Sequence, residues 1–150
     1  MWRGQQNFAI ICACLYRLIG RRSLARLVLS RHTLDIEILH WKVRYKVRVP
    51  RECRWCRFCR LAVESEAHAM IGCSAPDLVA LRYEFLKDVY SLAPDLPRRW
   101  TSEDVFLREL FLNQNFDLTQ RLAKYTYDVF AIFATCPVFR PAEYLYSTLE

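Results

Sequence analysis

Hydrophobic side chains recur at helical spacing in both halves of the chain. Near the N-terminus, apolar positions three and four residues apart predict an amphipathic helix that ends at Gly20 and a short second helix capped by Ser23. Three more helices are predicted: one begins at Ser74 or Pro76, one is opened by a capping box at Thr101, and the last is the longest. The apolar positions of the five stripes are Phe8, Ile11, Leu15 and Leu18; Leu24, Leu27 and Val28; Leu78, Leu81, Phe85 and Val89; Phe106, Leu107, Leu110 and Phe111; and Leu118, Leu122, Tyr125, Val129 and Phe133.

Between these helical regions the hydrophobic period changes to two. Apolar and cationic side chains alternate from Lys42 to Val49, and Leu34, Ile36 and Ile38 alternate in the same way upstream. We therefore expect residues 34–49 to be extended, with one apolar and one cationic face over residues 42–49.

The composition is that of one folded domain. The 150 residues are 53% hydrophobic and 14% aromatic, with 3 glycines and 6 prolines, which supplies enough apolar surface for a core and excludes a disordered chain. We expect a single domain over 1–150, with N-terminal helices in 1–33, a basic extended segment and metal motif in 34–75, and C-terminal helices in 76–150. The apolar run 8–16 is too short to span a bilayer, so no membrane role is expected.

Most of the cysteines and one histidine are concentrated in a short central stretch. Residues 53–73 hold four of the seven cysteines and one of the three histidines. The pattern Cys56-x2-Cys59-x8-His68-x4-Cys73 is typical of a Zn²⁺ site, in which three thiolates and one imidazole close a tetrahedron. Because no position stays open, the expected site is structural. A redox pair and thiols that pack in a core are the alternatives, and Cys53-x2-Cys56 offers a second register.

The spacing of the last two ligands requires a break in the backbone. A continuous helix turns about 100° per residue, so it cannot present both His68 and Cys73 to one ion. We expect a short helix that begins near Ser65 and a left-handed cap at Gly72 that turns Cys73 back toward the metal.

Charged neighbours are expected to support this centre. Glu64 or Glu66 is placed to accept the remaining N–H of the imidazole. Three thiolates with Zn²⁺ carry a net charge of −1, which Arg54, Arg57 and Arg60 can offset. With an odd number of cysteines and this motif, we expect a reducing, intracellular location, with the nucleus as one option. The isolated thiols Cys12, Cys14 and Cys136 are expected to pack as core residues.

Cationic and aromatic residues surround the motif. Residues 1–60 carry 14 Lys and Arg against 3 acids, whereas residues 61–150 carry 8 against 13. A basic segment with interleaved aromatic side chains is the composition of a platform for single-stranded nucleic acid, although the same residues can also pack under the turn. The candidate contact residues are Lys42, Arg44, Lys46, Arg48, Arg51, Arg54, Trp55, Arg57, Phe58 and Arg60.

Three stretches, RHTLDIEILHW, VPRECRWCRFCRLAVESEAHAMIGC and LVALRYEFL, resemble the region that follows the polymerase in LINE-type (non-long-terminal-repeat) retrotransposon reverse transcriptases. The tail LAKYTYDVFAIF…CPVFRP is similar to fungal members. The segment Ile38-Leu39-His40 departs from the short turn that the family usually has there. The positions that match the family's motifs are His32, Leu34, Ile36 and Glu37; the ligands Cys56, Cys59, His68 and Cys73; Glu64 and Glu66; and Leu81-Arg82.

The expected fold is therefore mainly α: a small helical domain with a short extended segment and a central zinc-binding turn. The expected function is a non-catalytic, zinc-stabilised nucleic-acid-binding module, because no polymerase or endonuclease motif is present. The resemblance implies RNA, single-stranded DNA or target DNA as partners, and a polymerase domain as a protein partner. The alternative is a helical protein-interaction domain in which zinc is purely structural. A thiol enzyme is a third, weaker interpretation.

Overall fold

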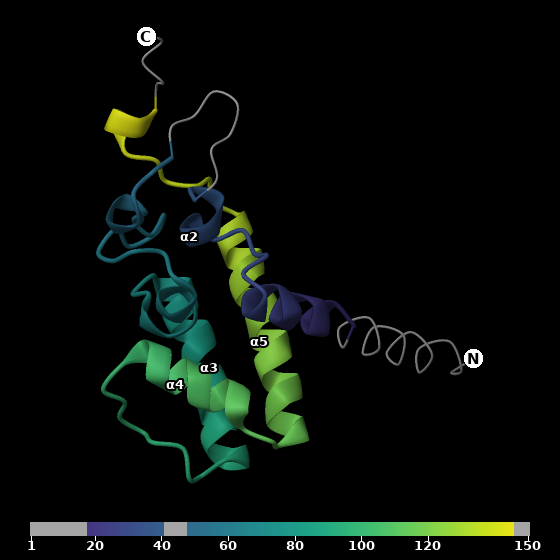
Figure 1. Cartoon of the computed structure of the whole chain (residues 1–150). Helices are drawn as coiled ribbons and strands as arrows, with labels where there is room; N and C mark the ends of the chain where they lie inside the picture. The colour runs from purple at the N-terminus through teal and green to yellow at the C-terminus, as the bar shows by residue number, and fades with distance from the viewer. Residues whose placement is uncertain (1–17, 41–47, 146–150) are drawn as a thin grey trace, which may run out of the picture.

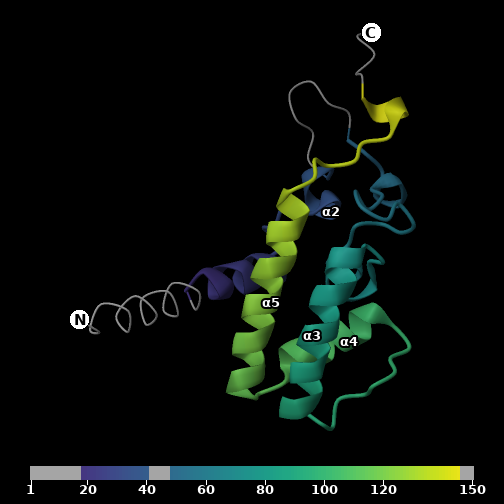
Figure 2. The ribbon, with the colours of Figure 1, turned by 180° about the vertical axis from the view of Figure 1, so that it is seen from behind.

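The computed structural model describes residues 18–40 and 48–145, which form a mainly helical fold, as predicted. Helix α3 (Pro76–Leu92) and helix α5 (Phe116–Ala134) lie side by side and run in opposite directions. Helix α4 (Glu103–Leu112) crosses them on one side (Figure 1). The view from behind shows the long α5 with the N-terminal helix on its other flank (Figure 2).

The two long helices form the core with the apolar positions that their sequences predict. Leu78, Phe85 and Val89 of α3 are buried, and all five predicted positions of α5 are buried as well. The rings of Phe85 and Tyr125 stack with centroids 4.0 Å apart. The stripe at 3.6-residue spacing therefore identified the packed faces correctly.

Of the helix starts predicted in the C-terminal half, one is confirmed and one is wrong. Helix α3 begins at Pro76, as expected. Helix α4 begins after Ser102, which makes no side-chain capping bond, so the capping box predicted at Thr101 is wrong. The side chain that does cap a helix is that of Asn115, which accepts hydrogen bonds from the backbone N–H groups of Asp117 and Leu118.

In the described residues, one helix runs through the boundary between the two that were predicted. Residues 18–28 are helical without a break, so Gly20 does not end a helix and Ser23 does not cap one. Gly20 faces α5, where a Cβ atom would lie 3.1 Å from the backbone C and O atoms of Ala123. The glycine therefore serves close packing rather than termination. The predicted positions Phe8, Ile11 and Leu15 lie outside the described residues.

The expectation of an extended segment over 34–49 is wrong for its first part. Asp35–Ile38 form a short helix, α2, followed by a turn at Leu39. The backbone N–H of Asp35 donates to Glu64 Oε1, and that of Ile36 donates to the Glu64 carbonyl. Capture of these free N–H groups by one acid favours helix over strand. Residues 41–47 lie outside the described part, so the alternation there stays a prediction.

The remaining short elements lie around the cysteines. A 3₁₀ turn at Arg51–Cys53 precedes them, a π-helical turn at His68–Gly72 follows, and another 3₁₀ turn at Ala142–Tyr144 lies near the end of the chain. Within the described ranges, the one β-bridge pairs Trp55 with Val63 in antiparallel fashion. No helix in these ranges combines the length and the apolar character needed to cross a membrane.

Candidate metal centre

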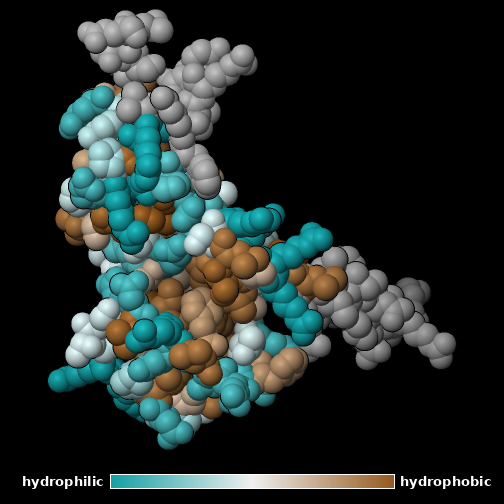
Figure 3. Space-filling view, viewed as in Figure 1, coloured by the Kyte–Doolittle hydropathy of each residue, from teal (hydrophilic) through white to brown (hydrophobic). Residues whose placement is uncertain are grey.

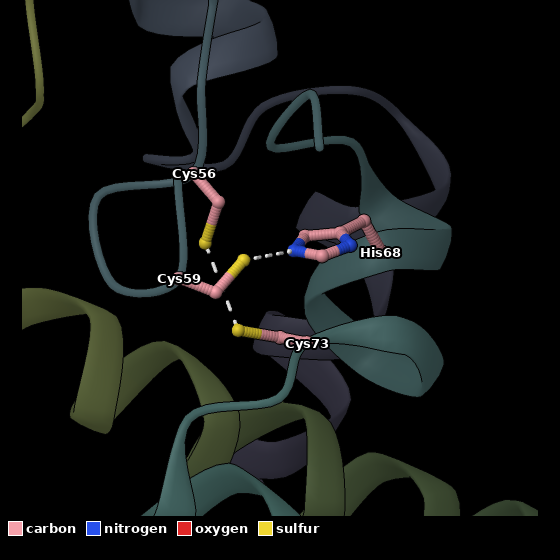
Figure 4. Close-up of side chains that lie close together, drawn as sticks. All are labelled: Cys56, Cys59, His68 and Cys73. Carbon is pink, nitrogen blue, oxygen red and sulfur yellow. Dashed lines mark hydrogen bonds between the residues drawn. The ribbon is translucent and has the colours of Figure 1, made fainter. Parts of the chain in front are cut away.

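The side chains of Cys56, Cys59, His68 and Cys73 point toward one another (Figure 4). The Sγ atoms of Cys56 and Cys73 are 3.7 Å apart, and Cys59 Sγ is 3.2 Å from His68 Nε2. All four ligand atoms lie within 4.8 Å of one another. A tetrahedron with Zn–S bonds of about 2.3 Å has sulfur atoms about 3.8 Å apart. The cluster therefore has the dimensions of a tetrahedral metal site, and the cysteines of the described ranges, Cys53 and Cys136 included, are free thiols.

The first two ligands are placed by a tight turn between the bridged residues Trp55 and Val63. The backbone N–H of Cys56 donates to Ala62 O at 2.9 Å, and that of Arg60 donates to Cys56 O at 3.0 Å. Arg60 closes the turn with φ 54°, the left-handed region that glycine usually takes. Both thiols therefore emerge on the same side of the turn.

The last two ligands are brought together by the π-helical turn. As predicted, a short helical stretch begins next to Ser65. The Ser65 Oγ accepts a hydrogen bond from the N–H of His68. The N–H of Cys73 then donates to the His68 carbonyl at 2.7 Å, a bond that spans five residues. This wide turn places Cys73 beside His68. The hydroxyl of Tyr125 in α5 donates to the Met70 carbonyl of the same turn.

The left-handed cap predicted at Gly72 is wrong, because no glycine among the described residues has positive φ. Gly72 serves packing instead. A Cβ atom at this position would collide with the carboxylate of Glu103, in the first turn of α4. The absence of a side chain at Gly72 thus leaves room for the carboxylate of Glu103 against the turn that carries His68.

The ligands are sheltered from water, and their titration is linked. Cys56 and Cys73 are fully buried, and His68 is 6% exposed. The hydrogen bond that Cys56 shares with Cys73, and then burial, raise the pKa of Cys56 to about 12, whereas the same bond lowers the pKa of Cys73. Burial works to lower the pKa of His68, but its hydrogen bonds and charge interactions with Cys56 and Cys59 raise it. The cluster thus shares protons that a bound cation would replace.

The predicted acid partners of His68 are bonded elsewhere. Glu64 accepts from the side chain and the backbone N–H of Arg57, and Glu66 Oε1 lies 2.9 Å from His32 Nε2. The hydrogen bond from His32 is the main cause that lowers the pKa of Glu66. Both acids hold chain segments together around the site rather than orienting the imidazole, so that expectation is wrong.

Arg57 is a buried structural residue. It is 7% exposed, and its guanidinium donates to Glu64 Oε1 and Asp35 Oδ1, both at 2.7 Å. Its Nη1 atom donates to the carbonyls of Phe133 and Cys136 at the C-terminal end of α5, at 3.1 and 3.0 Å. The side chain therefore fastens the turn that carries two of the ligands to the end of the longest helix.

Arg54 has a similar role. It is 4% exposed and donates to the carbonyls of Val49 and Ile36 at 3.0 and 2.7 Å. Because Arg54 and Arg57 are buried and bonded within the fold, the expectation that they contact nucleic acid is wrong. The charge of Arg57 is already paired with the carboxyl groups of Glu64 and Asp35, so Arg57 is not free to offset the thiolates.

The other nucleic-acid candidates divide into three groups. Arg48, Arg51, Trp55 and Arg60 are exposed, and Trp55 retains 38% of its surface. Phe58 is half-buried, and its ring meets that of Phe133 edge-on at 5.1 Å. Lys42, Arg44 and Lys46 lie outside the described residues.

One residue near the centre was not assigned a role from the sequence. Arg82 of α3 donates from Nη2 to the Cys73 carbonyl at 3.0 Å, while its Nη1 atom is buried without a hydrogen-bond partner in the described structure. A cation thus lies next to the backbone of a ligand. The only signal was the Leu-Arg pair in the retrotransposon resemblance, because a helical arginine four residues after Leu78 has no distinctive spacing.

Cys53 does not join the cluster. Its Sγ atom lies 4.0 Å from the hydroxyl of Tyr144, and the group of ligand atoms that could hold an ion contains Cys56 and Cys59. Of the two registers that the sequence allowed, the structure brings together the one that pairs Cys56 with Cys59.

Comparisons with known protein families, with curated proteins and with solved structures find no match to this chain. The retrotransposon resemblance therefore stays a prediction, and the geometry of the four ligands is the observation from which a function can be argued.

Proposed function

We propose that the chain binds one Zn²⁺ ion through Cys56, Cys59, His68 and Cys73, and that this centre is structural. The observation that carries the proposal is the convergence of four ligand atoms within 4.8 Å in a buried site. Three sulfurs and one imidazole nitrogen are the donor set that zinc prefers, and they leave no position for a substrate.

The energy of binding explains why such a site would be needed. The segment from Arg48 to Cys73 contains only short turns and an isolated bridge, so its own hydrogen bonds order it weakly. A structural zinc contributes about 10–16 kcal/mol of apparent binding free energy, which is comparable to the whole stability of a domain. The ion would therefore hold this segment on the helices.

Metal content tests the proposal directly. We expect about one zinc per purified chain by elemental analysis, and the visible absorption of tetrahedral cobalt after replacement by Co²⁺. Cys59→Ser should lose the ion, whereas the matched control Cys53→Ser should keep it, because Cys53 lies outside the cluster. A wild-type chain without metal, or equal loss from both variants, contradicts the proposal.

We further propose that the exposed side of this segment binds single-stranded nucleic acid, as the similarity to retrotransposon proteins implies. Arg48, Arg51 and Arg60 are exposed cations, and Trp55 offers a ring for base stacking. Binding would follow charge rather than base sequence, because the segment offers no pattern of base-edge contacts. The zinc centre would then stabilise the segment that binds nucleic acid and would catalyse no reaction.

RNA gel shifts at increasing salt test this second step. The measured quantity is the slope of log K for RNA binding against the logarithm of the salt concentration. With Arg48, Arg51 and Arg60 all changed to Gln, the magnitude of this slope should fall by about 2, since each lost contact with a single strand removes about 0.7. The control changes three other exposed arginines, Arg98, Arg99 and Arg108, to Gln and should leave the slope unchanged. Equal loss in both variants would indicate unspecific attraction to a cationic chain.

The alternative, a protein-interaction domain, is favoured by one observation. The helix of residues 18–28 and the turn after it expose Leu18, Val28 and Leu29 to 60%, 61% and 65%. Figure 3 shows hydrophobic surface over this helix beside hydrophilic side chains. Zinc-loaded protein that fails to shift RNA even at low salt would favour this alternative.

A further inference from the structure

The four ligands differ in their access to solvent. Cys56 and Cys73 are fully buried and His68 is 6% exposed, whereas Cys59 is half-buried. Among the four ligands, Cys59 is therefore the residue with the greatest contact with solvent. This asymmetry arises because Cys59 lies near the tip of its turn, two residues before Leu61, which is 76% exposed.

Two nitrogen atoms lie close to the sulfur of Cys59. The backbone N–H of Leu61 donates to its Sγ atom at 3.5 Å, and His68 Nε2 is 3.2 Å away. The next residue, Arg60, is an exposed cation whose guanidinium lies 4.5 Å from the centroid of the Phe139 ring. In the zinc-bound state proposed above Cys59 is held as a thiolate, and oxidants attack the thiolates that solvent can reach.

We propose that Cys59 is an oxidation site for hydroperoxides and that its oxidation opens the metal centre. The proposal rests on the zinc function proposed above. In the first step the Cys59 thiolate attacks one peroxide oxygen: the O–O bond breaks, an S–O bond forms, and hydroxide leaves. The sulfur loses two electrons to the peroxide and becomes a sulfenic acid.

A second ligand thiolate then resolves the sulfenic acid. The Sγ atoms of Cys56 and Cys73 both lie within 4.8 Å of Cys59 Sγ. Either thiolate attacks the oxidised sulfur, an S–S bond forms, the S–O bond breaks, and a second hydroxide leaves. The balance is two thiolates and one hydrogen peroxide to one disulfide and two hydroxide ions. Two of the four ligands are consumed, so the ion is released, and a thiol reductant restores the site.

The test uses the full chain with its four other cysteines replaced by serine, so that the three ligand thiols alone remain. These four are Cys12, Cys14, Cys53 and Cys136. Zinc content is measured first. Hydrogen peroxide is then added, release is followed with a chromogenic zinc chelator, and sulfenic acid is trapped with dimedone before peptide mapping. We expect one zinc released per peroxide consumed, dimedone on Cys59, and a disulfide that includes Cys59.

A matched variant separates attack at Cys59 from general oxidation. Cys59→His keeps a zinc ligand at this position without a thiol, and it should release zinc at least tenfold more slowly. Cys73→His keeps Cys59 and should still be labelled there by dimedone. Labelling of Cys56 or Cys73 before Cys59, a Cys56–Cys73 disulfide, or undiminished release from Cys59→His would overturn the proposal.

The two proposals fail in different ways. A chain that holds no zinc before peroxide is added overturns the zinc function, and this inference with it. A chain that holds zinc but loses it without modification of Cys59 overturns this inference alone. If Cys59→His does not fold, the dimedone label on the chain that keeps the three ligand thiols still decides between the outcomes.

Discussion

The guanidinium of Arg57 lies 2.7 Å from Glu64 Oε1, and both side chains are almost completely shielded from water. Glu64 also accepts hydrogen bonds from the backbone N–H groups of Asp35 and of Arg57 itself. One carboxylate therefore joins the backbone at Asp35 to the turn that carries Arg57. A network of hydrogen bonds and ion pairs thus lies next to the candidate metal centre. The ion would hold one side of the turn, and the pair of Arg57 and Glu64 would hold its other side.

Removal of Arg57 should therefore be costly. Arg57→Ala leaves Glu64 buried without its cation, and we expect a loss of about 3–5 kcal/mol in the free energy of unfolding. Arg57→Lys should recover little, because one ammonium cannot reach both carboxylates and the carbonyls of α5. Urea unfolding of the zinc-loaded protein measures both. The exposed control Arg99→Ala should stay within about 0.5 kcal/mol, and a similar small effect at Arg57 would refute the role assigned to this network.

The buried carboxyl pair predicts a pH dependence. Burial and then the charge of Glu64 raise the pKa of Asp35 to about 8, against the attraction of Arg57, and Asp35 Oδ2 has no hydrogen-bond partner in the described structure. Between the unfolded pKa near 3.8 and about 8, the folded state binds one more proton than the unfolded state. This contribution to stability is present at low pH and falls as pH rises, by at most about 1.4 kcal/mol per unit.

Asp35→Asn isolates this effect, since it keeps the shape of the side chain without its titration. The difference in unfolding free energy between the Asp35→Asn variant and the wild-type protein should shift in favour of the variant from pH 5 to pH 8. Both proteins share the same metal ligands, so the pH dependence of zinc binding cancels in the comparison. A difference that stays constant over this range would show that Asp35 does not hold the proton.

The conformation of Arg60 predicts opposite effects of two substitutions. With φ 54°, this residue has a backbone conformation that costs about 1–2 kcal/mol for a residue with a Cβ atom. Arg60→Gly removes that strain and should leave thermal stability equal or higher, even without the contact to Phe139. Arg60→Val should destabilise the zinc-loaded protein, because a β-branched residue disfavours this region most. Leu61→Val, at an exposed neighbour, serves as control. Thermal unfolding measures these effects. Equal unfolding midpoints for the Arg60→Gly and Arg60→Val variants would argue against a strained turn.

At position 20, glycine should give a more stable protein than alanine, although alanine is the better helix former. Gly to Ala inside a helix ordinarily gains about 1 kcal/mol. Here the added methyl group would press on the backbone of Ala123, which cannot move aside as a flexible side chain can. We expect Gly20→Ala to lower the unfolding free energy, and Ala25→Gly, on the exposed side of the same helix, to lower it through propensity alone. A more stable Gly20→Ala protein would mean that the two helices can separate.

The sequence predicted best where one local rule decides the structure. The stripes of α3 and α5 and the ligand spacing around Cys56 and Cys59 follow from periodicity and donor chemistry. The failures at Asp35, Arg54 and Arg57 have a common cause in contacts between distant residues. Nothing near Asp35 shows that Glu64 will capture the N–H groups of a short helix, and the pattern of Arg54 and Arg57 is equally that of a cationic surface. Their burial depends on carbonyls and acids elsewhere in the chain.

The distribution of the centre along the chain sets an order of assembly. The four ligands lie between residues 56 and 73, so closing them round an ion requires only short loops. The bonds from Arg57 to the end of α5 span 76 and 79 residues. On a ribosome that adds about 5–20 residues per second, the centre can close several seconds before its long-range clamp is synthesised. Until α5 has been synthesised, the guanidinium of Arg57 lacks the carbonyls of Phe133 and Cys136 as partners. A nascent chain would therefore bind its metal before α5 folds.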